Sequence, residues 1–255
     1  MREKRRARRV DILGVEIDAL TPQEAHIEIA RLVRAGTGHQ VVTVNPEFVM
    51  AARRDREFAD VLRHADLALA DGMGLLWASR ILGCPLRERV AGVEVVLGLA
   101  ALCAQQGFSL FLLGSAPGVA EEAARVLQEA NPGLKIAGTF PGSPRAEEED
   151  MICDLIRKAR PSILLVAFGA PQQDKWIRRH LSRTGVPVAM GVGGAFDFIS
   201  GRARRAPGWM RRIGLEWLYR LCRQPWRWRR MLALPQFAWL VWRARLTGKN
   251  SLQDC

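Results

Sequence analysis

The sequence lacks the patterns that mark zinc proteins, membrane-spanning proteins and secreted proteins. Its five cysteines show no C-x-x-C spacing and pair with no histidine cluster, which argues against a zinc site. No segment reaches the roughly 18 apolar residues of a membrane span. The basic segment 1–9 is followed by Asp11, Glu16 and Asp18, so the apolar core of a signal peptide is missing. These absences favour a cytoplasmic, reducing compartment.

A dinucleotide fingerprint is also missing. Gly191-Val-Gly-Gly194 lacks full G-x-G-x-x-G spacing and follows the last apolar strand, whereas the fingerprint occupies the first strand-to-helix turn. The four histidines, at positions 26, 39, 64 and 180, have no ligand spacing. We therefore expect no nicotinamide cofactor and assign the histidines no catalytic role.

Acidic residues are scarce at both ends of a chain whose net charge is +12. Segment 1–9 has six basic residues and one acid, and segment 202–245 has twelve arginines with Glu216 as its single acid. Such a balance calls for an anionic partner, which can be nucleic acid, a membrane surface or a phosphorylated substrate.

Short apolar runs alternate with helical segments between residues 10 and 200. The predicted buried strands are 40–44, 67–70, 109–113, 163–167 and 188–192. Strands that are apolar throughout indicate a mostly parallel sheet with helices on both faces, a Rossmann-like α/β fold. A hairpin is expected over 10–20, and a short strand over 135–138. The predicted units are a basic arm (1–9), the α/β core (10–200), a helical appendage (201–246) and a tail (247–255).

The stretch around Asp71 is the first candidate for chemistry. The apolar run 67–70 leads directly into Asp71, and Gly72 and Gly74 follow. A carboxylate at the carboxyl end of a buried strand lies where α/β proteins bind their ligands. The alternative is that Asp71 only caps the next helix.

Other polar and glycine residues also follow predicted strands and should meet Asp71 at one edge of the sheet. They are Thr43, Asn45, Gly114, Ser115, Gly169 to Gln173, Gly193, Gly194 and Asp197. Glycine turns let backbone N–H groups approach phosphate oxygens, and amide or hydroxyl side chains bind sugar hydroxyls. The alternatives are that Asn45-Pro46 is only a turn, and that Gln172 and Gln173 are solvated residues of a first helical turn.

The appendage has a composition of its own. Six of the eight tryptophans fall within 209–242, interleaved with arginines and broken by prolines. Tryptophan with arginine favours an anionic membrane–water interface. RNA binding by stacking and charge, or tryptophans packed inward in a small helical subdomain, are the alternatives.

Several segments together resemble one family. They are Thr43-Val-Asn-Pro-Glu47, Ala70-Asp-Gly-Met-Gly74, Arg89-Val-Ala-Gly-Val-Glu94, Leu112-Leu-Gly114, Gly169-Ala-Pro-Gln-Gln-Asp-Lys-Trp176, Gly191-Val-Gly-Gly-Ala-Phe-Asp197 and Arg202-Ala-Arg-Arg-Ala-Pro207. In this order they resemble the WecG/TagA/CpsF family of bacterial glycosyltransferases, over about 10–242.

The resemblance implies an inverting transferase that moves a sugar, N-acetylmannosamine by default, from a UDP-sugar donor. The implied acceptor is a polyprenyl-diphosphate-linked sugar of the N-acetylglucosamine type at the inner membrane face, for teichoic acid, common antigen or capsule synthesis. The chain would then be a peripheral protein of that membrane surface.

The resemblance also implies site roles. Asp71 matches the catalytic base, Thr43, Asn45, Arg89 and Gln173 match the pocket around donor sugar and acceptor, and Asp197 matches a position near the uridine. Arg220, Arg227 and Arg230 match appendage arginines that reach the diphosphates. Gly114 and Gly193 are added as substrate-binding residues of the strand ends.

The expected mechanism needs no metal ion or other cofactor. No Asp-x-Asp pair stands at a strand end, so arginines and backbone N–H groups are expected to stabilise the leaving UDP. With the resemblance considered, nucleic acid becomes an unlikely partner, and the second hypothesis is a basic RNA-binding protein that ignores Asp71. Self-association through the apolar appendage stays open.

Overall fold

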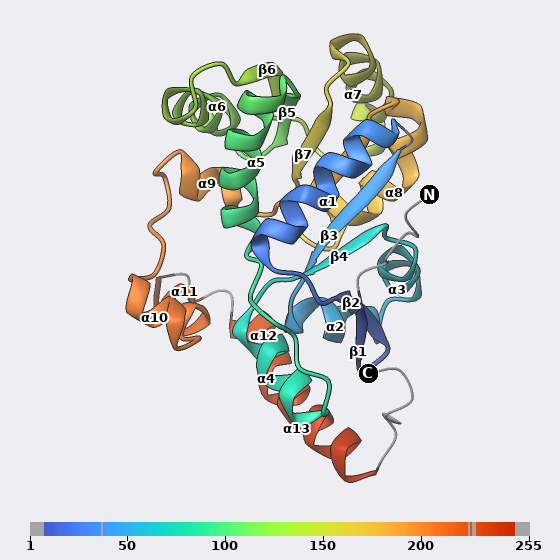
Figure 1. Ribbon diagram of the computed structural model, residues 1–255, viewed down its shortest axis with the longest axis vertical. Coiled ribbons are helices and arrows are strands. Elements are labelled where there is room, and N and C mark those ends of the chain that lie inside the picture. The colour runs from blue at the N-terminus through green and yellow to red at the C-terminus, as the bar shows by residue number, and fades with distance from the viewer. Residues whose placement is uncertain (1–7, 37, 224, 226–227, 248–255) are drawn as a thin grey trace.

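The computed structural model (Figure 1) describes residues 8–36, 38–223, 225 and 228–247. Its centre is a six-stranded sheet in which every neighbouring pair is parallel. In sheet order the strands are β4 (Leu67–Ala70), β3 (His39–Val44), β8 (Val188–Gly191), β7 (Ile163–Ala167), β5 (Ser109–Gly114) and β6 (Lys135–Phe140). The predicted Rossmann-like α/β fold is confirmed. The strand expected at 135–138 continues to Phe140, and the last strand ends at Gly191.

Helices cover both faces of the sheet because successive strand residues point to opposite sides. Val41 and Leu112 enter one apolar cluster, whereas Val42 and Leu113, one residue further along, enter clusters on the opposite face. The first face carries α1 (Pro22–Ala35), α5 (Gly92–Gln106), α6 (Val119–Ala130) and α9 (Ala195–Ile199). The other carries α2 (Pro46–Ala52), α3 (Arg56–Arg63), α7 (Ala146–Ala159) and α8 (Gln172–Thr184).

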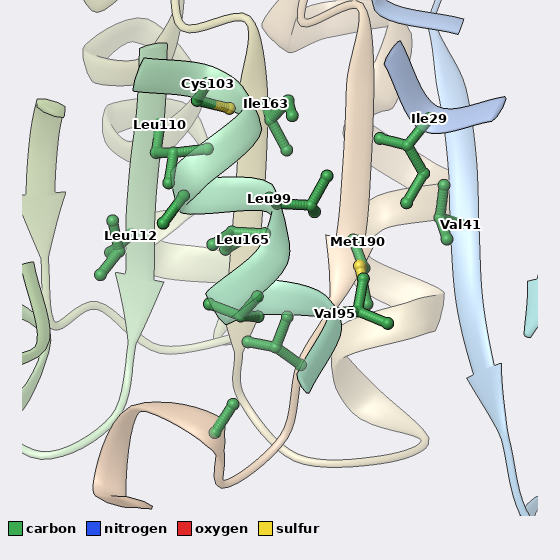
Figure 2. Packing of buried hydrophobic residues seen from close by; sticks show 14 of the residues in the cluster. Ile29, Val41, Val95, Leu99, Cys103, Leu110, Leu112, Ile163, Leu165 and Met190 are labelled. Atoms are coloured by element: carbon green, nitrogen blue, oxygen red, sulfur yellow. The ribbon is translucent and has the colours of Figure 1, made fainter. Parts of the chain in front are cut away.

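The cluster under α5 shows how the first layer is filled (Figure 2). Leu99 of α5 lies over the sheet between Leu165 and Met190, and all three side chains are fully buried. The side chains around these three residues are also buried and apolar, so the centre of the sheet is packed tightly against α5. The strand ends at its carboxyl edge are therefore held in fixed positions.

The N-terminal segment forms the expected hairpin, and the expected capping box starts the first helix. Strands β1 (Arg9–Ile12) and β2 (Val15–Asp18) pair antiparallel. Thr21 Oγ1 accepts from the Glu24 N–H at 3.2 Å, and Glu24 Oε2 accepts from the Thr21 N–H at 2.9 Å. Reciprocal bonds of this kind satisfy two otherwise orphaned donors at the helix start.

Among its described residues the appendage has four helices, and they contact the core unequally. They are α10 (Gly208–Arg212), α11 (Glu216–Arg223), α12 (Trp228–Met231) and α13 (Ala233–Leu246). Phe237 and Val241 of α13 are buried in the same cluster as α2 and α4 (Met73–Ile81). Helices α10 and α11 lie to one side of that contact (Figure 1). The appendage is thus docked mainly through its last helix.

Candidate active site

A cavity of about 520 Å³ opens at the carboxyl edge of the sheet. The helices that follow β3 and β7 go to one face and the helix that follows β8 goes to the other. Such a divergence of neighbouring connections leaves a crevice outside the strand ends, the usual ligand site of open α/β sheets. The predicted residues Thr43, Asn45, Asp71, Gln173, Gly193 and Asp197 all line this first cavity.

Asp71 follows β4, and hydrogen bonds hold both its backbone and its side chain. Its N–H donates to the Val44 carbonyl at 2.7 Å, and its Oδ2 accepts from the Gly92 N–H at 3.3 Å. The capping alternative is wrong, because the residue before α4 is Gly72 and no side chain caps that helix. Gly72 has φ +127°, a conformation that side chains rarely adopt. The turn therefore leaves the Asp71 carboxylate in the cavity wall.

Thr43 and Asn45 come from the end of β3. Asn45 caps α2, since its Oδ1 accepts from the Phe48 N–H at 3.0 Å, and Pro46 opens that helix. The Thr43 hydroxyl donates to the Gly191 carbonyl at 3.4 Å. Each side chain thus has a structural partner and also lines the cavity. Asn45 thus has the structural role of a helix cap, and its substrate-binding role stays a prediction.

The alternative that Gln172 and Gln173 are solvated residues of a first helical turn is wrong for Gln173 and holds for Gln172. The Gln173 side chain is buried, at 2% exposure, whereas Gln172 is exposed. Its Oε1 accepts from the Gly193 N–H at 3.0 Å, which joins the start of α8 to the turn after β8. The amide position is therefore defined, and the glycine turn is held beside it.

Asp174, beside Gln173, is a buried acid that the sequence gave no reason to select. Its carboxylate is completely buried, and neither oxygen has a hydrogen-bond partner among the described residues. Burial raises the pKa of Asp174 to about 7. A Cβ at Gly191 would stand 2.5 Å from Asp174 Oδ1, so only glycine fits at that point of β8. No periodicity or spacing marks an acid inside a first helical turn as buried.

A second cavity of about 790 Å³ adjoins the first. Asn45, Glu47, Asp71, Gly92 and Val93 line both. Most of its other lining residues are apolar and come from α4 and the appendage: Trp77, Trp217, Leu221, Trp228, Met231, Leu232, Leu234, Pro235, Phe237 and Ala238. Asp71 therefore stands where a polar cavity and an apolar one meet.

The predicted arginines and Gly114 are distributed differently. Arg230 lines the first cavity and pairs with Glu47 at 2.8 Å. Arg89 lines the second cavity and pairs with Glu216 at 3.4 Å. Gly114 lines neither cavity within the described residues; it lies against Ala167, where a Cβ would meet backbone at 2.9 Å.

Two further predicted residues cannot be placed. Arg227 lies outside the described residues, and so does the side chain of Arg220. Within the described ranges no three His, Cys, Asp or Glu side chains are grouped to hold a metal ion. The metal-independent mechanism stays a prediction.

A sequence profile described as "Glycosyl transferase WecG/TagA/CpsF family" matches residues 10–251. The chain belongs to this family. The chain is therefore a glycosyltransferase, and Asp71, at the junction of the two cavities, is its candidate base. The match spans the sheet, both cavities and the described appendage, and the RNA-binding alternative gains no support from it.

Curated relatives of this WecG/TagA/CpsF protein extend over most of its length. One from Bacillus subtilis (strain 168) is 37% identical over 80% of this chain and 79% of its own. One from Bacillus spizizenii is 35% identical, covering 87% and 85%. One from Staphylococcus aureus (strain MW2) is 30% identical over 98% of each chain. All three are named N-acetylglucosaminyldiphosphoundecaprenol N-acetyl-beta-D-mannosaminyltransferase.

Proposed function

We propose that this glycosyltransferase moves a sugar, N-acetylmannosamine by default, from UDP to a polyprenyl-diphosphate-linked N-acetylglucosamine, with inversion at the anomeric carbon. The observation that carries the proposal is the position of Asp71 at the junction of a polar and an apolar cavity. A water-soluble donor and a lipid-linked acceptor need two such cavities, and their reacting atoms have to meet at a base. The relatives' names supply the default donor sugar and acceptor.

The first cavity suits the UDP-sugar. Arg202, Arg204, Arg223 and Arg230 line it. Guanidinium groups bind phosphate oxygens through parallel hydrogen bonds, so they can hold the donor diphosphate. Thr43, Asn45 and Gln173 offer hydroxyl and amide groups to the sugar, and Asp197, at the start of α9, is assigned to the uridine end.

The second cavity suits the lipid-linked acceptor. Its apolar wall from α4, α12 and α13 can cover isoprene units, which bind through buried apolar area. The acceptor sugar then lies between this wall and Asp71. In this arrangement the acceptor hydroxyl and the donor anomeric carbon approach from opposite cavities.

The chemistry needs one base and a stabilised leaving group. Asp71 takes the proton of the acceptor hydroxyl as its oxygen attacks the anomeric carbon, and the bond from that carbon to the UDP oxygen breaks. The electron pair leaves on UDP, where the arginines of the first cavity offset the added negative charge. The attack comes from the face opposite to UDP, so the configuration inverts. No step requires a metal ion.

We further propose that the appendage docks on an anionic membrane surface, which places the enzyme peripherally on the cytoplasmic face. Trp209, Trp228, Trp239 and Trp242 are each more than half exposed. Indole rings at headgroup depth together with arginines are typical of interfacial binding. In the described part of the chain, none of the helices has the length and apolar character that crossing a membrane requires.

Vesicle co-sedimentation tests this docking. Wild-type protein should pellet with vesicles that contain phosphatidylglycerol, and a Trp239→Ser/Trp242→Ser variant should pellet several-fold less. Ile27→Ser is the matched control, because Ile27 is 67% exposed on α1 of the core and its loss should change nothing. Equal pelleting of all three proteins would contradict membrane docking by the appendage.

The reaction is tested by UDP release from purified protein in detergent. The acceptor is a short-chain polyprenyl-diphosphate N-acetylglucosamine, and a panel of UDP-sugars is supplied with and without EDTA. Release with one donor, unchanged by EDTA and lost in Asp71→Ala, is the expected result. Absence of release across the panel, in protein that binds neither UDP nor acceptor, would overturn the proposal.

A further inference from the structure

Two members of a cluster of three arginines lie on the wall of the second cavity, and only Arg89 among the three has an expected role, in the substrate pocket. Arg89, on the loop before α5, and Arg205, at the start of the appendage, both line this cavity. Arg211 of α10 completes the group behind them. The three guanidiniums converge on Glu94 of α5, at 3.5, 3.3 and 3.3 Å from its Oε1.

The cluster holds more positive charge and more hydrogen-bond donors than its acids can satisfy. In the part of the chain that the structure describes, these three arginines share two carboxylates, those of Glu94 and Glu216. One carboxylate oxygen cannot accept good hydrogen bonds from three guanidiniums. Among the described residues, the buried Nε atoms of Arg205 and Arg211 have no partner. These two atoms show that the donors of the cluster outnumber its acceptors, and the excess of guanidinium charge that Arg89 and Arg205 bring to the cavity wall favours an anionic ligand.

The position of the cluster indicates which anion it binds. An acceptor that reaches from the apolar wall to Asp71 has to place its diphosphate between its lipid and its sugar. Arg89 and Arg205 line the same cavity as the apolar wall and as Asp71. The donor diphosphate has a separate set of arginines in the first cavity, which includes Arg204.

We propose that Arg89 and Arg205 form a subsite for the acceptor's diphosphate, distinct from the arginines that bind the donor's diphosphate. Glu94 and Arg211 orient the two guanidiniums in this subsite. The adjacent residues Arg204 and Arg205 then bind different groups. Arg204 binds the donor's diphosphate in the first cavity, and Arg205 binds the acceptor's diphosphate in the second. This inference rests on the proposed function and assigns the lipid-linked substrate to particular side chains.

The adjacent pair gives a matched experiment. Arg205→Ala should raise the acceptor KM roughly 10- to 100-fold and leave the donor KM within two-fold. Arg204→Ala should raise the donor KM and leave the acceptor KM within two-fold. Arg212→Ala removes an exposed arginine of α10 that lines neither described cavity, and it controls for the change in net charge.

Binding measurements keep the test independent of turnover. A short polyprenyl diphosphate without sugar should bind Arg205→Ala more weakly than wild type, and UDP should bind both equally. Arg205→Lys, which keeps the charge and loses the planar fork, should recover part of the polyprenyl diphosphate affinity. Thermal unfolding of each variant shows whether the fold is retained.

The outcomes separate the two proposals. If wild-type protein turns over and Arg205→Ala shifts the donor KM, or both KM values equally, the acceptor subsite is wrong while the function stands. If wild-type protein shows no transfer with any donor, the proposed function fails. Polyprenyl diphosphate binding that depends on Arg205 would then still support the subsite, and binding that ignores Arg205 would overturn it.

Discussion

The sheet edge around Asp71 and the appendage from 201 to 246 are held by different kinds of interaction. The edge is fixed by buried strands and by backbone hydrogen bonds such as that from Gly92 to Asp71. Between 207 and 246, Met231, Phe237 and Val241 are the buried residues among those described. The other contacts between the appendage and the core include ion pairs such as Arg230–Glu47.

This difference matches the demands of the two substrates. A base needs a rigid position, because small errors in distance cost large factors in rate. A surface that takes up a long lipid needs an opening, and solvent-exposed ion pairs are weak enough to break. In the proposed reaction the base therefore lies on the rigid sheet edge, and the lipid enters beside the less tightly packed appendage.

The largest effect is expected for Asp71→Asn, which should leave the sheet edge intact and remove the proposed base. The amide can still accept from the Gly92 N–H, so the turn should keep its shape. We expect kcat to fall roughly 10²- to 10⁴-fold, measured by UDP release. Asp66→Asn, a carboxylate at the opposite end of β4, should keep kcat within two-fold. A drop of equal size in both variants would argue against Asp71 as the base.

The second prediction compares packing in the two regions. Leu165→Ala in the centre of β7 creates a cavity in a fully buried cluster and should lower the free energy of unfolding by about 2–5 kcal/mol. Trp239→Ala, at 60% exposure on α13, should change it by less than about 0.5 kcal/mol. Urea unfolding measures both values. Similar losses would show that the appendage is packed like the core.

A third prediction concerns pH at the sheet edge. Burial raises the folded-state pKa of Asp174 from 3.8 to about 7. The folded protein therefore binds the Asp174 proton more tightly than the unfolded chain does. The free energy of unfolding accordingly falls as pH rises from about 4 through about 7. Between pH 5 and pH 8, Asp174→Asn should lose less unfolding free energy than wild type does. Identical pH profiles in urea unfolding would contradict a raised pKa.

The smallest effect is expected at the ion pair that ties α12 to the core. Glu47→Gln removes the partner of Arg230, which is half exposed, and should weaken the contact by less than about 1 kcal/mol. Trypsin should cleave within 228–246 at most about five-fold faster, and the difference should shrink with added salt. Glu57→Gln, which removes a partner of Lys175 in the core, is the matched control. Faster cleavage in the control would mean that the effect is not local.

The sequence predicted the sheet because its strands are apolar at every position, as in 163–167. It predicted that strand-end residues would meet, since parallel strands end at one edge, and Thr43, Asp71 and Gly193 do line one cavity. It could not predict the second cavity, because that wall combines α4 with helices more than a hundred residues away in the chain.

Other parts of the site were hidden for similar reasons. The sequence was equally consistent with a solvated Gln173, because the burial of a residue at a helix start depends on the neighbouring strand. The Glu94 cluster joins α5 to the appendage, so nothing local in the sequence signals it. Gly114 shows the opposite case: its strand-end position suggested a ligand, and it is used for close packing on Ala167.

The place of α13 in the chain has a consequence for synthesis. Its residues Phe237 and Ala238 complete the second cavity and come late in translation, whereas the residues lining the first cavity from the sheet are made well before it. A nascent chain can therefore form the first cavity, whose last lining residue is Arg230, before α13 completes the second. A chain that terminates before residue 233 would keep Asp71 and lose Leu234, Pro235, Phe237 and Ala238 from the apolar wall of the second cavity.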